Sequence, residues 1–418
     1  MNIFNYLGNI VYDVKNFFYK KNSFVYGSSY LLGQKGAIWV NVDKPNELYN
    51  TIPQVKAVVD KKALMFSNMD IKLIDSSTGE KVDDPEFYKL MANPNILQAM
   101  NDWLRQYKTQ EQVYGNQFMY KNKPSNLIKY PLSLMNISPR YMTPYLTGKV
   151  FNQVKIEDVI AFYEYYEDGD KTKKRFETTD ILFSRINDID NPIIGVSPLS
   201  NLIYPISNIK AAYEYRNVIM TEKGAIGILS NESKDAMGAI PLPPSEKKAI
   251  QDSYINNFGA GVGQQRIHIT EASLKWQPMT YPTKDLMLFE EVDANTLTII
   301  DSFGLNVNMF SNKNATYENV KNSIIQVYQD TIIPEADQFT QALGNFIGIE
   351  KGKEMLADFS HISILQDDEN DKTDSLSKKI AAITQLSDKG IISNSTALEV
   401  INNLTGLNII SSNNNSLA

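Results

Sequence analysis

Apolar residues at the start of the chain recur at the spacing of an amphipathic helix. Within residues 1–21 they alternate with polar residues and comprise Ile3, Phe4, Leu7, Ile10, Val11, Val14, Phe17 and Phe18. The segment lacks the continuous apolar core of a signal peptide, and no run of about 18 apolar residues occurs in the chain, so we expect no transmembrane helix. This first helix either docks on the body of the protein or of a neighbouring copy, which we favour, or binds a membrane surface.

The next part of the chain mixes helix and strand patterns. Clusters of β-formers predict strands at 37–42 and 70–74, and amphipathic periodicity predicts a helix over 54–66. Further helices are expected to begin near Pro85 and at Asn93. Segments rich in aromatic and β-branched residues then predict a small antiparallel sheet, at 114–122, 133–139 and 159–168.

Two long helical patterns enclose a compact insert. The first pattern covers 197–223 and is interrupted by Pro205, and at about 1.5 Å per residue it could span roughly 40 Å. The insert, 225–283, contains short strands, one helix and a glycine-rich turn. The second helix is expected over 284–304.

A third helical pattern and a helical tail complete the chain. The third helix is predicted over 317–346, with a kink at Pro334. The acidic segment 366–374 predicts a solvated, mobile linker, and the segments 375–390 and 393–406 read as two short helices that end at glycine. Taken together, these patterns predict an α+β fold.

Several short motifs occur in a fixed order along residues 190–345. They are Gly195-Val196-Ser197-Pro198-Leu199, Ala225-Ile226-Gly227-Ile228-Leu229, Phe303-Gly304-Leu305-Asn306-Val307, Thr316-Tyr317-Glu318-Asn319 and Ile333-Pro334. In this order and spacing the chain resembles the portal proteins of tailed bacteriophages. Weaker matches lie at Asn93-Pro94-Asn95, Tyr114-Gly115-Asn116 and Gly390-Ile391-Ile392-Ser393. The loop 311–316 departs from the family, in which a short glycine turn is common.

The resemblance implies a portal-like α+β fold with seven consecutive regions. These are an α/β wing (1–195), a first stem helix (196–224), a small α/β clip (225–283), a second, antiparallel stem helix (284–304), a tunnel loop (305–316), a tunnel helix with the return to the wing (317–365), and a short helical crown with the C-terminal tail (366–418). The motif residues it singles out are Gly195, Ser197, Pro198, Leu199, Thr316, Tyr317, Asn319 and Pro334.

The function that this resemblance implies is structural rather than enzymatic. Portal subunits form a dodecameric ring at one capsid vertex of the virion, and this head-tail connector is the channel for DNA packaging and ejection. The implied partners are further copies of the chain, the major capsid protein, the terminase large subunit, head-completion or adaptor proteins, and the double-stranded DNA in the channel, with assembly in the host cytoplasm. The alternatives are another ring-forming phage connector or capsid component, or a phage enzyme that acts on DNA or cell wall.

The charge of the chain limits how it can handle DNA. A net charge of −7 argues against tight binding, because DNA-binding proteins gain affinity by neutralising phosphates. The acidic segment 285–301 would repel phosphates from a channel wall, or it is an ordinary solvated face, or it contacts basic residues of a neighbouring copy. Lys313, in the loop that follows, either contacts phosphate or is only exposed to solvent. The channel residues implied by family position are Glu290, Asp293, Asp301, Asn306, Asn308, Met309, Ser311, Asn312, Lys313 and Asn314.

The composition allows a substantial core but few kinds of catalytic chemistry. Hydrophobic residues make up 43% of the chain, and the absence of cysteine excludes disulfides, thiolate metal sites and cysteine nucleophiles. His268 and His361 are 93 positions apart, without the spacing of a metal-binding helix. The glycines of 259–263 follow a helix, and 348–353 lacks the hydroxyl of a phosphate loop. The aromatic run 162–166 lacks interleaved basic residues and predicts packing rather than base stacking. We therefore expect no catalytic residue, cofactor or metal.

Overall fold

The computed structural model describes residues 44–125, 127–147, 154–166, 173–189, 191, 193–221, 227–231, 234–235, 238–239, 243–257, 274–278, 288–310, 316–389 and 393–405. The predicted N-terminal helix, the strand predicted at 37–42 and the glycine turn at 259–263 lie outside the described residues. Within the described part, no helix combines the length and apolar character that crossing a membrane requires.

Helices α4 (Pro53–Ser67) and α6 (Met100–Tyr114) form the centre of the body and pack against each other. Helices α3 (Pro45–Thr51) and α5 (Pro85–Ala92) flank them. Helix α6 begins later than the prediction, which was wrong in placing its start at Asn93. The Asn95 side chain accepts a hydrogen bond from the N–H of Leu97 and donates one to the carbonyl oxygen of Leu134, so residues 93–98 form a loop against the neighbouring sheet.

The strands of the body form two three-stranded antiparallel sheets and one two-stranded sheet. The first has the order β3 (Ser133–Ile137), β2 (Asn116–Asn122) and β7 (Ile181–Arg185), and the second has the order β4 (Met142–Leu146), β5 (Ile160–Tyr165) and β6 (Lys174–Phe176). The predicted strands are present, but the prediction of one sheet was wrong. The chain turns after β3 and enters a separate sheet, and apolar residues of both sheets share one cluster: Phe118, Ile137, Met142, Ile160, Tyr163 and Ile181. The aromatic run of β5 therefore packs, as predicted.

A pairing distant in the sequence closes the body. Strand β1 (Asp70–Asp75), which was predicted, pairs antiparallel with β12 (Lys353–Asp358), which was not. The main core extends from α4 and α6 through this sheet to the long helices that follow.

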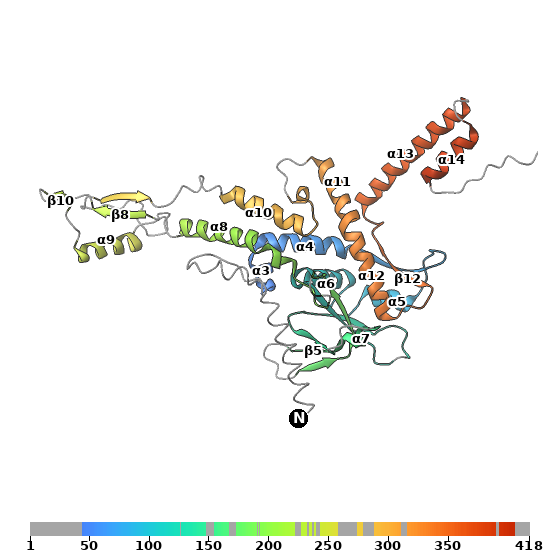
Figure 1. The fold of residues 1–418 in the computed structure, drawn as a ribbon, viewed down its shortest axis with the longest axis horizontal. Helices are drawn as coiled ribbons and strands as arrows, with labels where there is room; N and C mark the ends of the chain where they lie inside the picture. Colours follow the sequence, from blue (N-terminus) through green and yellow to red (C-terminus); the bar gives the residue numbers. More distant parts are fainter. Residues whose placement is uncertain are drawn as a thin grey trace, which may run out of the picture.

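Helices α8 (Ile203–Thr221) and α10 (Leu288–Ser302) contact each other and run antiparallel (Figure 1). The 3-10 helix η2 (Pro198–Leu202) leads into α8. The prediction that Pro205 interrupts the helix was wrong. Pro205 lies in the first turn of α8, where its missing N–H breaks no intrahelical hydrogen bond. Ile206 of α8 and Ile299 of α10 are fully buried in the main core, and they anchor both helices to the body.

A small lobe lies at the end of α8 that points away from the body (Figure 1). It contains helix α9 (Pro244–Asn257), strand β8 (Gly227–Asn231) paired antiparallel with β11 (Leu274–Pro278), and the short pair β9 (Lys234–Asp235) and β10 (Gly238–Ala239). Helix α9 and strands β8 and β11 agree with the helix and short strands predicted there, whereas the pair β9–β10 was not predicted.

The C-terminal third of the chain is mostly helical. Helix α11 (Tyr317–Val327) continues through a π-helical turn (Tyr328–Ile332) into α12 (Ile333–Ile347). Helix α13 (Ser363–Asp388) then contacts α14 (Asn394–Thr405). The expected acidic linker at 366–374 is instead part of α13.

Candidate functional site

The G-x-SPL motif forms a joint between the body and α8. Gly195 lies against Gly115, the residue that ends α6 in the left-handed conformation with φ of 72°. A Cβ on Gly195 would be 2.2 Å from the carbonyl oxygen of Gly115, and a Cβ on Gly115 would be 2.2 Å from the carbonyl carbon of Val196. Only glycine fits at either position without displacing backbone.

Two polar side chains fix this joint. The amide of Asn116 accepts from the N–H of Gly195 at 2.8 Å and donates to its carbonyl oxygen at 2.8 Å. The Ser197 hydroxyl donates to the carbonyl oxygen of Val113 at 2.6 Å and accepts from the N–H of Leu199 at 3.2 Å. Pro198 occupies the first position of η2, and Leu199 is fully buried. The Gly115-Asn116 and Gly195-Ser197 motifs, distant in the sequence, thus form one structure that sets the direction in which α8 leaves the body.

The predicted channel carboxylates of α10 share one exposed stripe. Glu290, Asp293 and Asp301 are exposed, and their spacing of three and eight residues puts them on the same side of the helix. Among the described residues, no side-chain hydrogen bond or ion pair involves any of the three carboxylates. Glu291 belongs elsewhere, because its carboxylate accepts from Asn208 of α8 at 3.2 Å and from Asn295 at 2.8 Å. The stripe and the α8 contact therefore occupy different faces.

The first half of the predicted tunnel loop is anchored. Leu305 is buried, and Met309 and Phe310 pack against the main core. Asn306 accepts from the N–H of Asn308 at 3.0 Å, and the Asn308 amide donates to Ser323 of α11 at 3.1 Å. The remaining predicted channel residues, Ser311, Asn312, Lys313 and Asn314, lie outside the described residues.

The start of α11 has the capping that its motif predicts. The Thr316 hydroxyl accepts from the N–H of Asn319 at 3.3 Å. Tyr317, the first residue of the helix, is 85% exposed. Its ring therefore does not pack in the core of the isolated subunit.

The kink predicted at Pro334 takes the form of the π-helical turn just before it. Proline lacks the N–H of a regular helix and clashes with the carbonyl four residues earlier, and a wider turn relieves both problems. The turn also brings the Thr331 hydroxyl to the carbonyl oxygen of Gly304, at 3.0 Å. This bond joins the end of α10 to the continuous helix α11–α12 at the base of the tunnel loop (305–316).

A buried ionic cluster that the sequence did not indicate holds α12 in the body. Lys62 of α4 donates to Glu335 of α12 at 2.8 Å, and Lys108 of α6 forms ion pairs with Glu335, at 2.8 Å, and with Glu111. The side chains of the two lysines are 9% and 5% exposed. Burial raises the pKa of Glu335, but the attraction of Lys108 and Lys62 outweighs this and lowers it overall. Burial lowers the pKa of Lys62.

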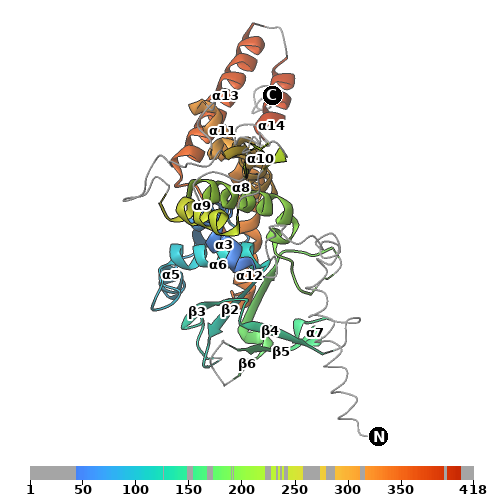
Figure 2. The same cartoon turned by 90° about the vertical axis from the view of Figure 1, so that its left-hand side faces the viewer.

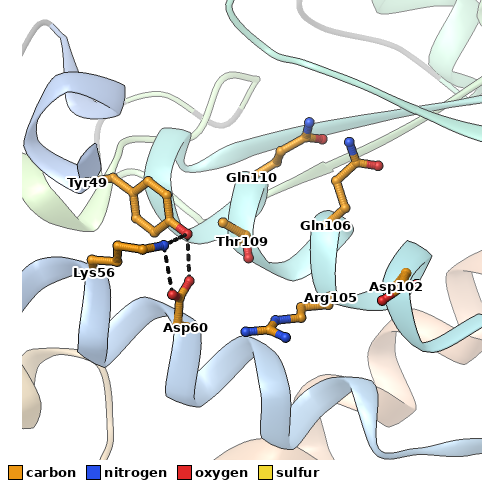
Figure 3. A pocket seen from close by; sticks show the side chains of 8 residues that line it. All are labelled: Tyr49, Lys56, Asp60, Asp102, Arg105, Gln106, Thr109 and Gln110. Carbon is orange, nitrogen blue, oxygen red and sulfur yellow. Dashed lines mark hydrogen bonds and ion pairs between the residues drawn. The ribbon is translucent and has the colours of Figure 1, made fainter. Parts of the chain in front are cut away.

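A polar cleft of about 470 Å³ opens between α3, α4 and α6 (Figure 3). On one side the Tyr49 hydroxyl donates to Asp60 at 2.5 Å and accepts from Lys56 at 2.9 Å, while Lys56 pairs with Asp60 at 2.8 Å. Asp102 and Arg105 lie on the other side. Burial and the Asp60 contact raise the pKa of Tyr49. Tyr49, Lys56 and Asp60 use their polar groups in hydrogen bonds and an ion pair with one another. We therefore interpret the cleft as a fixed part of the surface rather than a reactive site.

The sequence matches the family model described as phage portal protein over residues 53–391, which is most of its length. The chain belongs to the phage portal protein family. Members of this family are structural components of the phage head-tail connector, and the match points to no enzyme family.

Two relatives and several solved structures are similar to this family member. An uncharacterized protein of Rickettsia felis is 22% identical over 299 residues, 70% of this chain and 73% of the relative. One of Rickettsia bellii is 23% identical over 354 residues, 82% of this chain and 86% of the relative. A chain from the neck of a native gene transfer agent particle, described with C12 symmetry, has a TM-score of 0.57 at 17% identity, covering 86% of this chain and 93% of its own. An HK97-family phage portal protein from Corynebacterium diphtheriae has a TM-score of 0.50 at 10% identity, covering 78% and 96%.

Proposed function

We propose that twelve copies of this chain form a ring at one vertex of a phage capsid, and that DNA enters and leaves the head through its centre. Membership of the portal family supports this proposal. The similar neck chains come from particles described with C6 and C12 symmetry, and a twelve-membered ring is compatible with both. The ring would assemble in the host cytoplasm and become part of the virion.

Each part of the subunit then has a place in the ring. Residues 1–195 form the wing, α8 and α10 form the stem within 196–224 and 284–304, and the lobe within 225–283 forms the clip. The tunnel loop (305–316) leads to the tunnel helix and wing return (317–365), and α13 and α14 belong to the crown (366–418). The antiparallel contact of α8 and α10, with the lobe beyond their outer end, supports this assignment.

The carboxylate stripe of α10 is the observation on which the channel proposal depends. Glu290, Asp293 and Asp301 are exposed on the isolated subunit, on a face that α8 does not cover. If this face lines the channel, each stripe is repeated around the ring, and phosphates that pass within the Debye length, about 8 Å at physiological salt, are repelled from the wall. DNA can then slide instead of adhering.

Because residues Leu305–Phe310 are anchored, only the rest of the tunnel loop is proposed to contact DNA. Their packing on the core supports a fixed wall, and it leaves residues 311–316, including Lys313, as the segment proposed to approach the phosphates. One cation from each subunit is a weak contact, which suits transient rather than lasting binding.

The proposed partners follow from the same arrangement. The major capsid protein would surround the wing, the terminase large subunit would dock during packaging, and head-completion or adaptor proteins would bind the clip after it. Hydrolysis of ATP would belong to the terminase, and we assign no catalytic residue to this chain.

A topological DNA-retention assay tests the channel proposal. In the stripe variant, Glu290→Lys and Asp293→Lys convert repulsion into attraction. In the control variant, Glu86→Lys and Glu354→Lys make the same charge change at exposed positions of the body. Preassembled rings are mixed at low salt with one plasmid, either linear or as a closed circle, and bound DNA is measured by gel shift.

A closed circle has no end that can enter a preformed channel. We expect the stripe variant to retain linear DNA and release the closed circle, with retention lost as salt increases. The control variant should retain linear and closed circular DNA to the same extent. Equal retention of linear and circular DNA by the stripe variant would place the stripe on the outside of the ring and refute the channel assignment.

A further inference from the structure

The second sheet of the body has one face that the core does not use. Tyr163 of β5 packs in the apolar cluster shared by the two sheets, and alternation along the strand puts Phe162 and Glu164 on the opposite face. The register places Tyr145 of β4 opposite Phe162. It also places Arg175 of β6 opposite Glu164. The four residues that share this outer surface, here called the β5 face, are Tyr145, Phe162, Glu164 and Arg175.

Three planar groups stack on the β5 face. The rings of Tyr145 and Phe162 are nearly parallel, with an interplanar angle of 15° and centroids 4.7 Å apart. The guanidinium carbon of Arg175 lies 4.5 Å from the centroid of the Phe162 ring. Both rings are half-buried, and neither packs in the apolar clusters that the described residues form. Because the Arg175 side chain is exposed, the stack is a surface feature to which a further planar group can be added.

The charges beside the stack are unbalanced in favour of cations. The Glu164 side chain is 8% exposed, and its carboxylate accepts from Lys173 at 2.6 Å and from the Tyr145 hydroxyl at 3.0 Å. Burial raises the pKa of Glu164, but the hydrogen bonds from Lys173 and Tyr145 outweigh this and lower it overall. The carboxylate is therefore ionised and already paired. Arg175 forms no hydrogen bond or ion pair with any described residue, so its charge is left for a partner.

Neighbouring residues supply what the sequence of β5 lacks for base stacking. The run 162–166 has no cation of its own, but the fold brings Arg175 of β6, and Lys173 just before it, beside these rings. Proteins that hold single-stranded nucleic acid without sequence preference combine aromatic rings, which stack on bases, with cations that follow the phosphates. Arginine planes also stack on unpaired bases. A duplex keeps its bases inside the double helix and cannot use such a surface.

We propose that the β5 face binds single-stranded nucleic acid, with a base on the stack of Tyr145, Phe162 and Arg175 and the phosphates beside Lys173. The sheet lies at the end of the body opposite α13 and away from α10 (Figure 1, Figure 2), so this site is separate from the proposed channel. Two cations give weak, reversible binding, which is compatible with the net charge of −7. The inference goes beyond the proposed function and does not require that the chain form a ring.

Fluorescence anisotropy of labelled oligonucleotides tests this site in the full-length chain. The probes are oligo(dT), oligo(U) and a DNA duplex, each about 15 nucleotides long, at low salt. We expect both single strands to bind and the duplex to bind at least about 10-fold more weakly. The logarithm of the binding constant should fall against the logarithm of the salt concentration with a slope of about −1.4, as expected for two phosphates.

Substitutions on the β5 face should weaken this binding in different ways. Phe162→Leu removes the ring at the centre of the stack and should weaken single-strand binding about 10-fold. Arg175→Gln changes an exposed side chain, so the fold should be kept, and it should weaken binding and make the salt slope shallower by about 0.7. Tyr145→Phe keeps the ring and should bind like the unsubstituted chain. So should the matched control Arg105→Gln, which removes the same charge from an exposed position on α6.

Photo-cross-linking then locates the bound strand. An oligonucleotide that carries 5-iodouracil is irradiated with the full-length chain, and mass spectrometry of the digested protein identifies the attachment site. We expect attachment at Tyr145 or Phe162. Attachment within the tunnel loop (305–316), equal affinity for single strands and duplex, or unchanged binding by both Phe162→Leu and Arg175→Gln would overturn the proposal. A chain that binds no single strand would overturn it as well, without bearing on the portal function.

Discussion

Substitution of Gly115 by alanine should be among the most damaging small changes in the body. Two separate penalties apply at this position. A side chain at φ of 72° is disfavoured by about 1–2 kcal/mol. The new Cβ would also lie 2.2 Å from both the carbonyl carbon and the carbonyl oxygen of Val196, and forced overlap with a fixed neighbour costs about 1–3 kcal/mol more. We therefore expect a loss of about 2–5 kcal/mol in the free energy of unfolding.

Two further glycines separate these penalties. Gly79 has the same φ of 72° with nothing within 4 Å of an added Cβ, so Gly79→Ala should cost only the conformational penalty, about 1–2 kcal/mol. Gly195→Ala adds overlap, at 2.2 Å from the carbonyl oxygen of Gly115, without a positive φ. Its expected cost is about 1–3 kcal/mol.

Urea unfolding at a fixed protein concentration, followed by circular dichroism, measures all three variants. The midpoint should shift least for Gly79→Ala and most for Gly115→Ala, with an unchanged slope. Equal shifts for Gly79→Ala and Gly115→Ala would show that the joint tolerates a Cβ, and would refute the close contact of the two backbones.

Further predictions concern the buried ionic cluster and the base of the tunnel loop. Glu335→Gln leaves Lys62 and Lys108 without their shared carboxylate and should destabilise the chain by about 3 kcal/mol in urea unfolding. The exposed Glu350→Gln should shift the urea midpoint much less. The pKa of Glu335 is lowered on folding, so its contribution to the free energy of unfolding should be complete above the ordinary pKa of 4.5. This contribution should be lost as the pH falls through the lower pKa of the folded state. Urea midpoints measured across the acidic pH range would reveal the loss. In Glu335→Gln that part of the acid sensitivity should vanish. Thr331→Val removes the bond to Gly304 and should cost about 1 kcal/mol, whereas Thr331→Ser should retain most of it.

The sequence predicted the elements that local patterns define. Apolar periodicity located α4, α8, α10 and the α11–α12 rod, and proline and glycine marked several of their ends. The kink expected at Pro334 appears as the π-helical turn. Strand β12 was missed because only its pairing with the distant β1 makes it a strand. The acidic segment in α13 was misread as a linker, because a run of charged and polar residues favours a solvated coil.

The candidate site divides in the same way. Exposure of Glu290, Asp293 and Asp301 follows from helical spacing and is observed, while their place in a channel stays a prediction. The joint between Gly115 and Gly195 could be listed as two motifs but not as one contact, because the sequence does not say which backbones meet. The ionic cluster needed three helices, and only the pair of Lys108 with Glu111 had a spacing visible in the sequence.

The most direct test of the central claim is a cryo-electron microscopy reconstruction of the purified full-length chain. The account predicts a closed ring in which α10 faces the opening, with Glu290 and Asp293 on the channel wall. A monomer, or a ring with these carboxylates on its outer surface, would contradict it.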